Sequence, residues 1–176
     1  KKDKVYKSDF LAEIGYLDAD SISRYYSPET NIVKVQKSIK TKKATNFYKI
    51  YYNVDNVSDI TKLDSFRRLG DEEAYKAPHI VLKKGLEDNR VCASYISKDC
   101  SFRDGVYGFY SINKDVLKVL MTYFNSKLST YFLFMTISSY GIEREQIMKR
   151  EYLTIPIGIK EEDIGNILVN VNFIIE

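Results

Sequence analysis

The chain has 176 residues, of which 44% are hydrophobic, 29% charged and 14% aromatic, with 27 basic against 24 acidic side chains. This length and composition fit a domain with its own core and exclude a collagen, a disordered tail and a disulfide scaffold. The formal net charge of +3 is too small to indicate a nucleic-acid partner by itself.

The first third of the chain predicts a short helix followed by a lysine-rich segment. Residues 8–17 carry apolar side chains at helical spacing, and Ser8 is suited to the N-cap. No acidic residue lies between Glu29 and Asp55, a window that holds six lysines. Residues 1–50 therefore carry 11 basic and 6 acidic side chains, whereas residues 51–176 carry 16 and 18. Lysines beside the aromatic run 47–52 are typical of a surface that follows phosphates, with a solvated hairpin as the alternative.

The remaining pattern places strands first and helices later. Strands are expected at 32–36, 47–54, 78–83, 90–96 and 106–112. A strong helical pattern covers 115–137 and breaks at Asn125-Ser126, where Ser126 can cap a second helix. A short helix is expected over 143–150, an edge strand over 153–157, and a final helix over 161–175 that opens with acidic residues. This order favours an α+β fold over a doubly wound sheet.

Six apolar side chains of the 115–137 pattern are expected to pack against the sheet: Leu117, Leu120, Phe124, Leu128, Phe132 and Met135. The chain divides into a lysine-rich segment, 1–65, and a core, 66–176, that contains the helices 115–137 and 161–175. The first segment is either part of the same domain or a lead-in to it.

Patterns typical of catalysis and metal binding are missing. There is no glycine-rich nucleotide loop or Gly-x-Ser-x-Gly motif, and no lysine follows an acid at the two-residue offset of common metal-dependent nucleases. One histidine and two cysteines cannot form a Cys₂His₂ or Cys₄ zinc site. We therefore predict no catalytic and no metal-binding residues, and we interpret His79 as structural or DNA-facing rather than as a general base.

The location of the protein is predicted from the same sequence features. Cys92 and Cys100 are expected to be unconnected structural thiols, as in a reducing compartment. No secretory signal is visible at the N-terminus, and the apolar stretch 116–137 is too polar to span a bilayer. We expect a cytoplasmic protein with no membrane contact.

The second half of the chain carries a recognisable order of motifs. The segment 76–85 gives a proline, a strand and basic residues, and 91–95 and 102–111 follow as strand-like runs. Leu117, Leu120 and Phe124-Asn125-Ser126-Lys127 then resemble a leucine-rich helix that ends in Leu-Asn-Ser-Lys, with phenylalanine at the leucine position. The segments 138–141 and 147–157 complete the pattern. Over about residues 66–175 the chain resembles the C-terminal target recognition domain of TaqI-type adenine-specific DNA methyltransferases and fused restriction-modification enzymes, whereas the first third departs from it.

The resemblance implies a curved sheet with packed helices that reads double-stranded DNA beside a catalytic methyltransferase domain of the same parent chain. It implies no cofactor in this chain, because S-adenosylmethionine binds the catalytic domain. The phosphate contacts expected from the sequence are Lys37, Lys40, Lys42, Lys43, Lys83, Lys84 and Arg90, and the base contacts are Asn46, Arg103 and Ser139. About six neutralised phosphates predict a slope near −5 for log affinity against log salt.

Two alternatives remain open at this point. One is a specificity subunit of a multi-subunit, type I restriction system, which would carry a second recognition domain and long joining helices. The other is a general single-stranded nucleic-acid or RNA-binding domain that uses the lysine-aromatic window. A preference for one short duplex sequence separates the first two hypotheses from the third. An Asn-Pro-Pro-Tyr-like motif in the parent sequence would separate the methyltransferase from the subunit.

Overall fold

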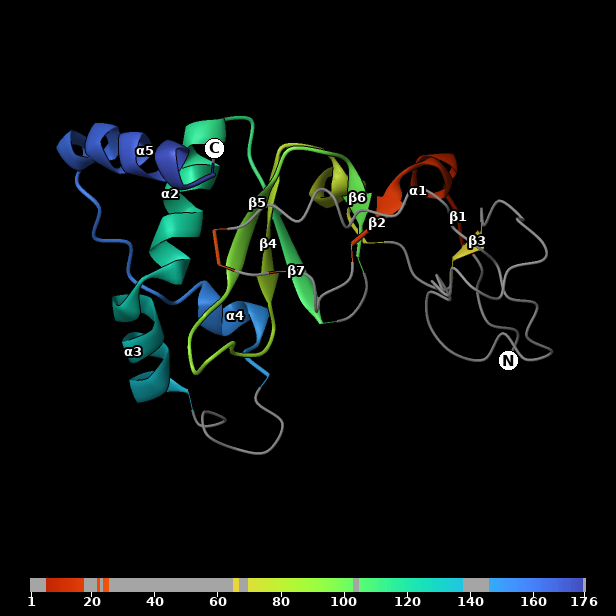
Figure 1. Cartoon of the computed structure of the whole chain (residues 1–176). Helices are drawn as coiled ribbons and strands as arrows, with labels where there is room; N and C mark the ends of the chain where they lie inside the picture. Colours follow the sequence, from red (N-terminus) through yellow and green to blue (C-terminus); the bar gives the residue numbers. More distant parts are fainter. Residues whose placement is uncertain are drawn as a thin grey trace.

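The computed structural model describes residues 6–17, 22, 24–25, 65–66, 70–102, 105–137 and 146–175. Within these ranges the chain has a mixed α+β fold on a three-stranded antiparallel sheet, in the order β5-β4-β7 (Figure 1). Its strands are β4 (His79–Lys83), β5 (Ala93–Ile96) and β7 (Val106–Tyr110). They confirm the strands predicted within 78–83, 90–96 and 106–112. The strands predicted at 32–36 and 47–54 lie outside the described residues.

Two short strand pairs extend the fold at the N-terminal side. Strand β1 (Tyr6–Lys7) pairs antiparallel with β3 (Ser65–Phe66), and β2 (Gly15–Tyr16) pairs parallel with β6 (Cys100–Ser101). The backbone of Leu17 also donates to the Ser101 carbonyl at 2.8 Å. Strand β2 is thus joined to β6, and Leu17 and Ile22 pack into a hydrophobic cluster with Val81 of β4.

In the part of the chain that the structure describes before β4, the helices are short. Helix α1 (Asp9–Glu13) begins at Ser8, whose hydroxyl accepts a hydrogen bond from the Leu11 amide at 3.1 Å, so the predicted N-cap is confirmed. The helix ends earlier than predicted because the chain turns into β2. The 3₁₀ helix η4 (Glu72–Tyr75) leads into β4 and is capped by the Asp71 carboxylate.

Strand β4 is covered on both faces. Ile80 and Leu82 belong to the main hydrophobic cluster on the helix side, while Val81 belongs to a second cluster with Leu17 and Ile22. The same alternation continues along the neighbouring segment, residues 91–96. Val91, Ala93 and Tyr95 join the first cluster, and Cys92 and Ile96 join the second. Because both faces are covered, every side chain of β4 before Lys83 is buried.

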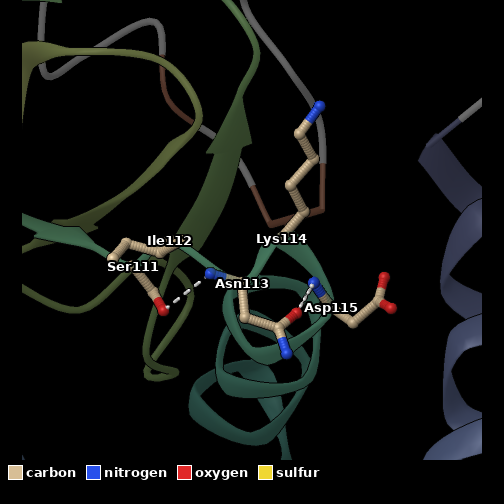
Figure 2. A pocket seen from close by; sticks show the side chains of 5 residues that line it. All are labelled: Ser111, Ile112, Asn113, Lys114 and Asp115. Carbon is tan, nitrogen blue, oxygen red and sulfur yellow. Dashed lines mark hydrogen bonds between the residues drawn. The ribbon is translucent and has the colours of Figure 1, made fainter.

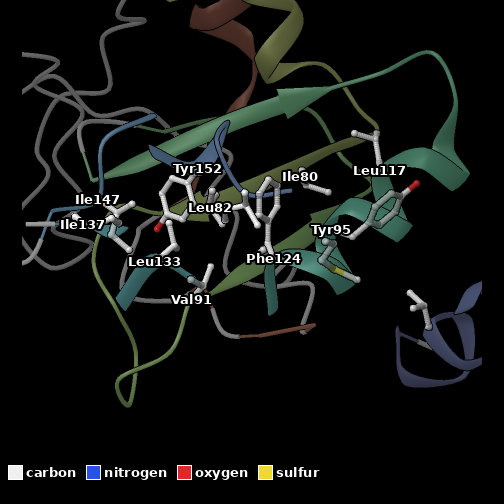
Figure 3. Packing of buried hydrophobic residues seen from close by; sticks show 14 residues of the cluster. Ile80, Leu82, Val91, Tyr95, Leu117, Phe124, Leu133, Ile137, Ile147 and Tyr152 are labelled. Carbon is white, nitrogen blue, oxygen red and sulfur yellow. The ribbon is translucent and has the colours of Figure 1, made fainter. Parts of the chain in front are cut away.

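In the described residues after β7 the helices are α2 (Lys114–Asn125), α3 (Lys127–Thr136), α4 (Lys149–Tyr152) and α5 (Glu161–Ile175). Figure 3 shows that α2, α3 and α4 contribute Phe124, Leu133 and Tyr152 to the packing around Leu82. Helix α5 packs on α2, where the ammonium group of Lys118 donates to the side-chain oxygen of Asn172 at 2.5 Å. Among the described helices, none is long and apolar enough to cross a membrane.

The C-terminal elements agree with the sequence in part. The final helix has the predicted bounds, with Glu161, Glu162 and Asp163 in its first turn. The short helix predicted over 143–150 is observed from Lys149, and residues 143–145 lie outside the described residues. The edge strand predicted over 153–157 is wrong. The backbone amides of Leu153 and Thr154 are bonded to carbonyls of α4, so this segment forms the turn that ends the helix.

The predicted packing of the long helical segment is correct for α2 and wrong for part of α3. Leu117 and Phe124 are buried, and Leu120 and Phe132 are partly buried against the main cluster. Leu128 and Met135, however, are 64% and 62% exposed. The hydroxyl of Ser126 accepts from the Ser129 amide at 3.0 Å and starts a new helix, as predicted. This new start resets the helical phase, so that α3 buries Ser129, Thr130 and Leu133 instead.

Asn125 connects the end of α2 to the edge of the sheet. Its side chain is fully buried, and its amide nitrogen donates to the Ala93 carbonyl at 2.8 Å while its amide oxygen accepts from the Ala93 amide at 2.9 Å. The Thr130 hydroxyl accepts from the Val91 amide at 3.3 Å on the same edge. Within the described residues β5 is an edge strand, and these side chains, together with the Tyr25 amide, which donates to the Ala93 carbonyl at 3.2 Å, pair its backbone groups over this stretch.

We predict that Asn125→Ala lowers the free energy of unfolding by about 2–4 kcal/mol, because it leaves the buried Ala93 amide without a partner. Asn125→Asp should cost a similar amount although it keeps the shape, since a carboxylate oxygen would then face the Ala93 carbonyl. Urea denaturation measures both, and Asn170→Ala on the exposed face of α5 is the control, with a change within about 0.5 kcal/mol. A stable Asn125→Ala variant would contradict this role.

Candidate nucleic-acid interface

Three of the ten predicted DNA contacts lie together on one hairpin. Lys83 ends β4, Lys84 follows it, and Arg90 lies on the returning strand, where the backbone groups of Glu87 and Arg90 pair at 2.8 and 3.0 Å. The hairpin, residues 84–90, lies between α3 and α4 at one end of the sheet (Figure 1). The other seven predicted contacts lie outside the described residues: Lys37, Lys40, Lys42, Lys43, Asn46, Arg103 and Ser139.

Lys83 and Lys84 differ in their surroundings. The Lys83 side chain is only 18% exposed, and its ammonium nitrogen lies 3.5 Å from a Glu87 carboxylate oxygen. Lys84 is partly exposed, and its ammonium nitrogen lies 4.8 Å from the ring centre of Tyr107, within cation–π range. The backbone carbonyls of the two lysines accept hydrogen bonds from the Tyr152 hydroxyl and the Ile147 amide. Helix α4 is therefore fixed against the base of the hairpin.

Arg90 has a structural contact. Its guanidinium Nη2 donates to the Asn125 backbone carbonyl at 2.6 Å, at the end of α2, where a positive charge complements the helix dipole. The Nε atom of Arg90 is buried and has no hydrogen-bond partner. Arg90 thus joins the hairpin to the α2–α3 junction.

Sequence reasoning missed four basic residues around the same hairpin. Arg24 donates from Nη1 to the Glu87 carbonyl at 2.7 Å and approaches the Asp88 carboxylate at 3.5 Å. Lys127 is exposed just after Asn125, and Lys149 and Arg150 are exposed on α4. Only the local run at 83–90 was visible in the sequence, because the other segments come from distant parts of the chain.

Together these segments form a basic end of the sheet, which we define as residues 24, 83–90, 125–127 and 147–151. They carry seven basic and three acidic side chains. Each acid has a partner within the described structure. Glu87 lies near Lys83, Asp88 lies near Arg24, and Glu151 accepts from the Met148 amide at 2.6 Å. The result is a surface of net positive charge that attracts polyanions.

His79 is a core residue. The side chain is fully buried, with Nδ1 3.0 Å from the Lys76 carbonyl and Nε2 3.4 Å from the Cys100 sulfur. A carbonyl only accepts, so Nδ1 carries the proton and Nε2 accepts from the thiol. Burial lowers the pKa of His79 from 6.5 to about 4, so the ring is neutral at physiological pH. Of the two predicted roles, structural and DNA-facing, the structure supports the structural one.

The two thiols are also structural. Cys92 and Cys100 are free and buried, as predicted. Burial raises the pKa of the Cys92 thiol, which favours the unreactive protonated form. Among the described residues, no group of three His, Cys, Asp or Glu side chains is arranged to hold a metal ion.

A shallow depression lies at the start of α2, lined by Ser111, Ile112, Asn113, Lys114 and Asp115 (Figure 2). The Asn113 side-chain oxygen accepts from the Asp115 amide at 2.9 Å, and the Ser111 hydroxyl accepts from the Asn113 amide at 3.2 Å. These bonds cap the helix, so we interpret the depression as the outer surface of an N-cap.

Comparison with known proteins finds no matching protein family, no similar curated protein and no similar solved structure.

We predict that Arg90→Ala lowers the free energy of unfolding by about 2 kcal/mol, because it removes a charged hydrogen bond from the end of α2. Arg150→Ala removes the same charge from an exposed position and should change the stability by less than about 0.5 kcal/mol. Chemical denaturation of both variants compares the two. Equal stabilities would show that the contact between Arg90 and Asn125 contributes nothing.

The buried His79 also predicts a pH dependence of stability. The folded state holds a neutral ring with a pKa near 4, whereas the unfolded chain binds a proton near pH 6.5. This contribution is therefore present above pH 6.5 and is lost as the pH falls toward 4, by about 2 kcal/mol between pH 7 and pH 5. His79 is the only histidine, so its proton NMR signal reports the folded pKa directly. A titration midpoint above 6 would contradict this result.

Proposed function

We propose that this chain is a sequence-specific recognition module for double-stranded DNA, belonging to an adenine-specific DNA methyltransferase or a fused restriction-modification enzyme. The observation that carries the proposal is the basic end of the sheet. Basic residues lie on the hairpin 84–90 and on three other segments that are bonded to it, and two of the three acids among them, Glu87 and Asp88, lie in ion pairs. This arrangement supports contacts to the phosphates of a duplex, which position a protein on DNA.

The proposal divides the basic residues by role. Lys84, Lys127, Lys149 and Arg150 are the phosphate contacts, since Lys127, Lys149 and Arg150 are exposed and Lys84 is partly exposed. Lys83, Arg24 and Arg90 shape the surface, because each makes an ion pair or hydrogen bond to the hairpin or to the helix junction beside it. The lysine-rich segment 34–49 adds further phosphate contacts in this proposal.

Catalysis is assigned to another domain of the parent protein. In this proposal that domain binds S-adenosylmethionine and transfers the methyl group, while the present chain selects the sequence. The support within the chain is that His79, Cys92 and Cys100 are all buried in the core, so these residues do not offer a nucleophile or a base at the surface.

We predict that the chain binds duplex DNA with a steep salt dependence. Four phosphate contacts give a slope of about −3.6 for log affinity against log salt, so a fourfold rise in salt weakens binding roughly 150-fold. If the six lysines of 34–49 also contribute, the slope approaches about −9. The double variant Lys149→Gln/Arg150→Gln should reduce the slope by about 2. Fluorescence anisotropy on a duplex oligonucleotide measures these slopes.

Lys160→Gln is the matched control, because Lys160 is exposed, lies outside the basic end and pairs with Glu162 at 3.3 Å. It should leave the slope unchanged. Equal slopes for the double variant and the control would remove the basic end from the proposal. Tighter binding to a single strand than to the duplex would favour the general single-stranded or RNA-binding alternative.

A further inference from the structure

The tip of the hairpin has a defined backbone conformation. Asp88 and Asn89 both have positive φ angles, 50° and 58°, and the backbone groups of Glu87 and Arg90 pair on either side of them. This is the pattern of a two-residue hairpin turn of type I′, in which aspartate and asparagine are favoured because they tolerate the left-handed region. Both side chains are exposed.

The base of the tip is held from two sides. Arg24 donates to the Glu87 carbonyl at 2.7 Å and pairs with the Asp88 carboxylate at 3.5 Å. On the other strand, Arg90 is bonded to the Asn125 carbonyl at 2.6 Å. In Figure 3 the chain just before Val91 forms a narrow loop that extends beyond the core side chains. The tip is therefore presented on a rigid base, which is what a reading site requires.

The charges around the tip favour an approach to DNA. Arg24 offsets the charge of Asp88, and Lys84 and Arg90 lie on the two flanks of the hairpin. A narrow two-stranded ribbon fits the major groove of B-form DNA, which is about 12 Å wide. An asparagine amide presents an N–H donor beside a carbonyl acceptor, the pair that matches N7 and N6 of adenine.

We propose that the Asp88–Asn89 tip enters the major groove and that Asn89 is a specificity-determining residue that reads one adenine. This inference rests on the proposed function and adds to it a base-reading residue. Asp88, paired with Arg24, orients the tip. The phosphate contacts of the basic end hold the hairpin in the groove.

The test selects binding sites from a duplex library with a randomised core of about 12 base pairs, using the full 176-residue chain. Asn89→Gly removes the amide and keeps the left-handed backbone, since glycine adopts positive φ without strain. It should abolish a roughly 10- to 100-fold preference for adenine at one position and leave the other positions and the salt slope unchanged. Asn89→Asp should shift that position toward cytosine, whose N4 group donates to a carboxylate.

Asn170→Asp makes the same side-chain change on the exposed face of α5, and it should leave the selected sequence unchanged. Circular dichroism establishes that each variant is folded. If the wild-type chain selects a sequence and Asn89→Gly selects the same one with the same preference at every position, the inference about Asn89 is overturned and the proposed function stands. If the wild-type chain selects no sequence at all, the proposed function itself fails.

Discussion

The hydrogen bonds between the Asn125 side chain and the backbone of Ala93 are the interaction on which the rest of the structure depends. An edge strand exposes backbone groups that need partners, and a buried amide supplies one donor and one acceptor at once. Because Asn125 must face the sheet, α2 ends there and α3 begins in a new direction. The Asn125 backbone carbonyl then has no partner within a helix, and it accepts a hydrogen bond from Arg90 of the hairpin. One residue therefore fixes the sheet edge, the helix junction and the hairpin.

The contacts that join the hairpin to the sheet edge and the helix junction are relevant to the proposed function. A surface that reads DNA bases needs side chains held in place before the duplex arrives, because loose groups lose entropy on binding. The hairpin 84–90 meets this requirement through contacts with Arg24, Asn125 and Ile147, which come from three distant parts of the chain. Its rigidity thus arises from the core of the domain. Arg90 illustrates the consequence, since its replacement is expected to disturb the fold as well as the charge of the surface.

The sequence predicted the elements whose pattern is local and could not predict the contacts between distant segments. The apolar run 80–82 located β4, the alternation along 91–96 located β5, and the acidic first turn located α5. The phase of α3 was wrong because the Asn-Ser break restarts the helix, and a pattern extended across a break keeps the old phase. The strand at 153–157 was wrong because β-branched residues and Pro156 are only local signals, whereas the Leu153 and Thr154 amides bond back to carbonyls of α4. Arg24 and Arg150 were missed because nothing local indicates that their segments contact the hairpin or its base.

The Asn-Ser pair that contributes to the family resemblance has a structural role in this chain. The pair is therefore no evidence for DNA binding by itself. Asn125 holds the sheet edge and Ser126 caps α3, so these residues would be needed by any protein with this junction, whether or not it binds DNA. Support for DNA recognition must therefore come from exposed residues. The basic end of the sheet and the Asp88–Asn89 tip contain exposed charged or polar residues that the core positions. A variant of such a residue that loses sequence preference but keeps its stability would locate the function there.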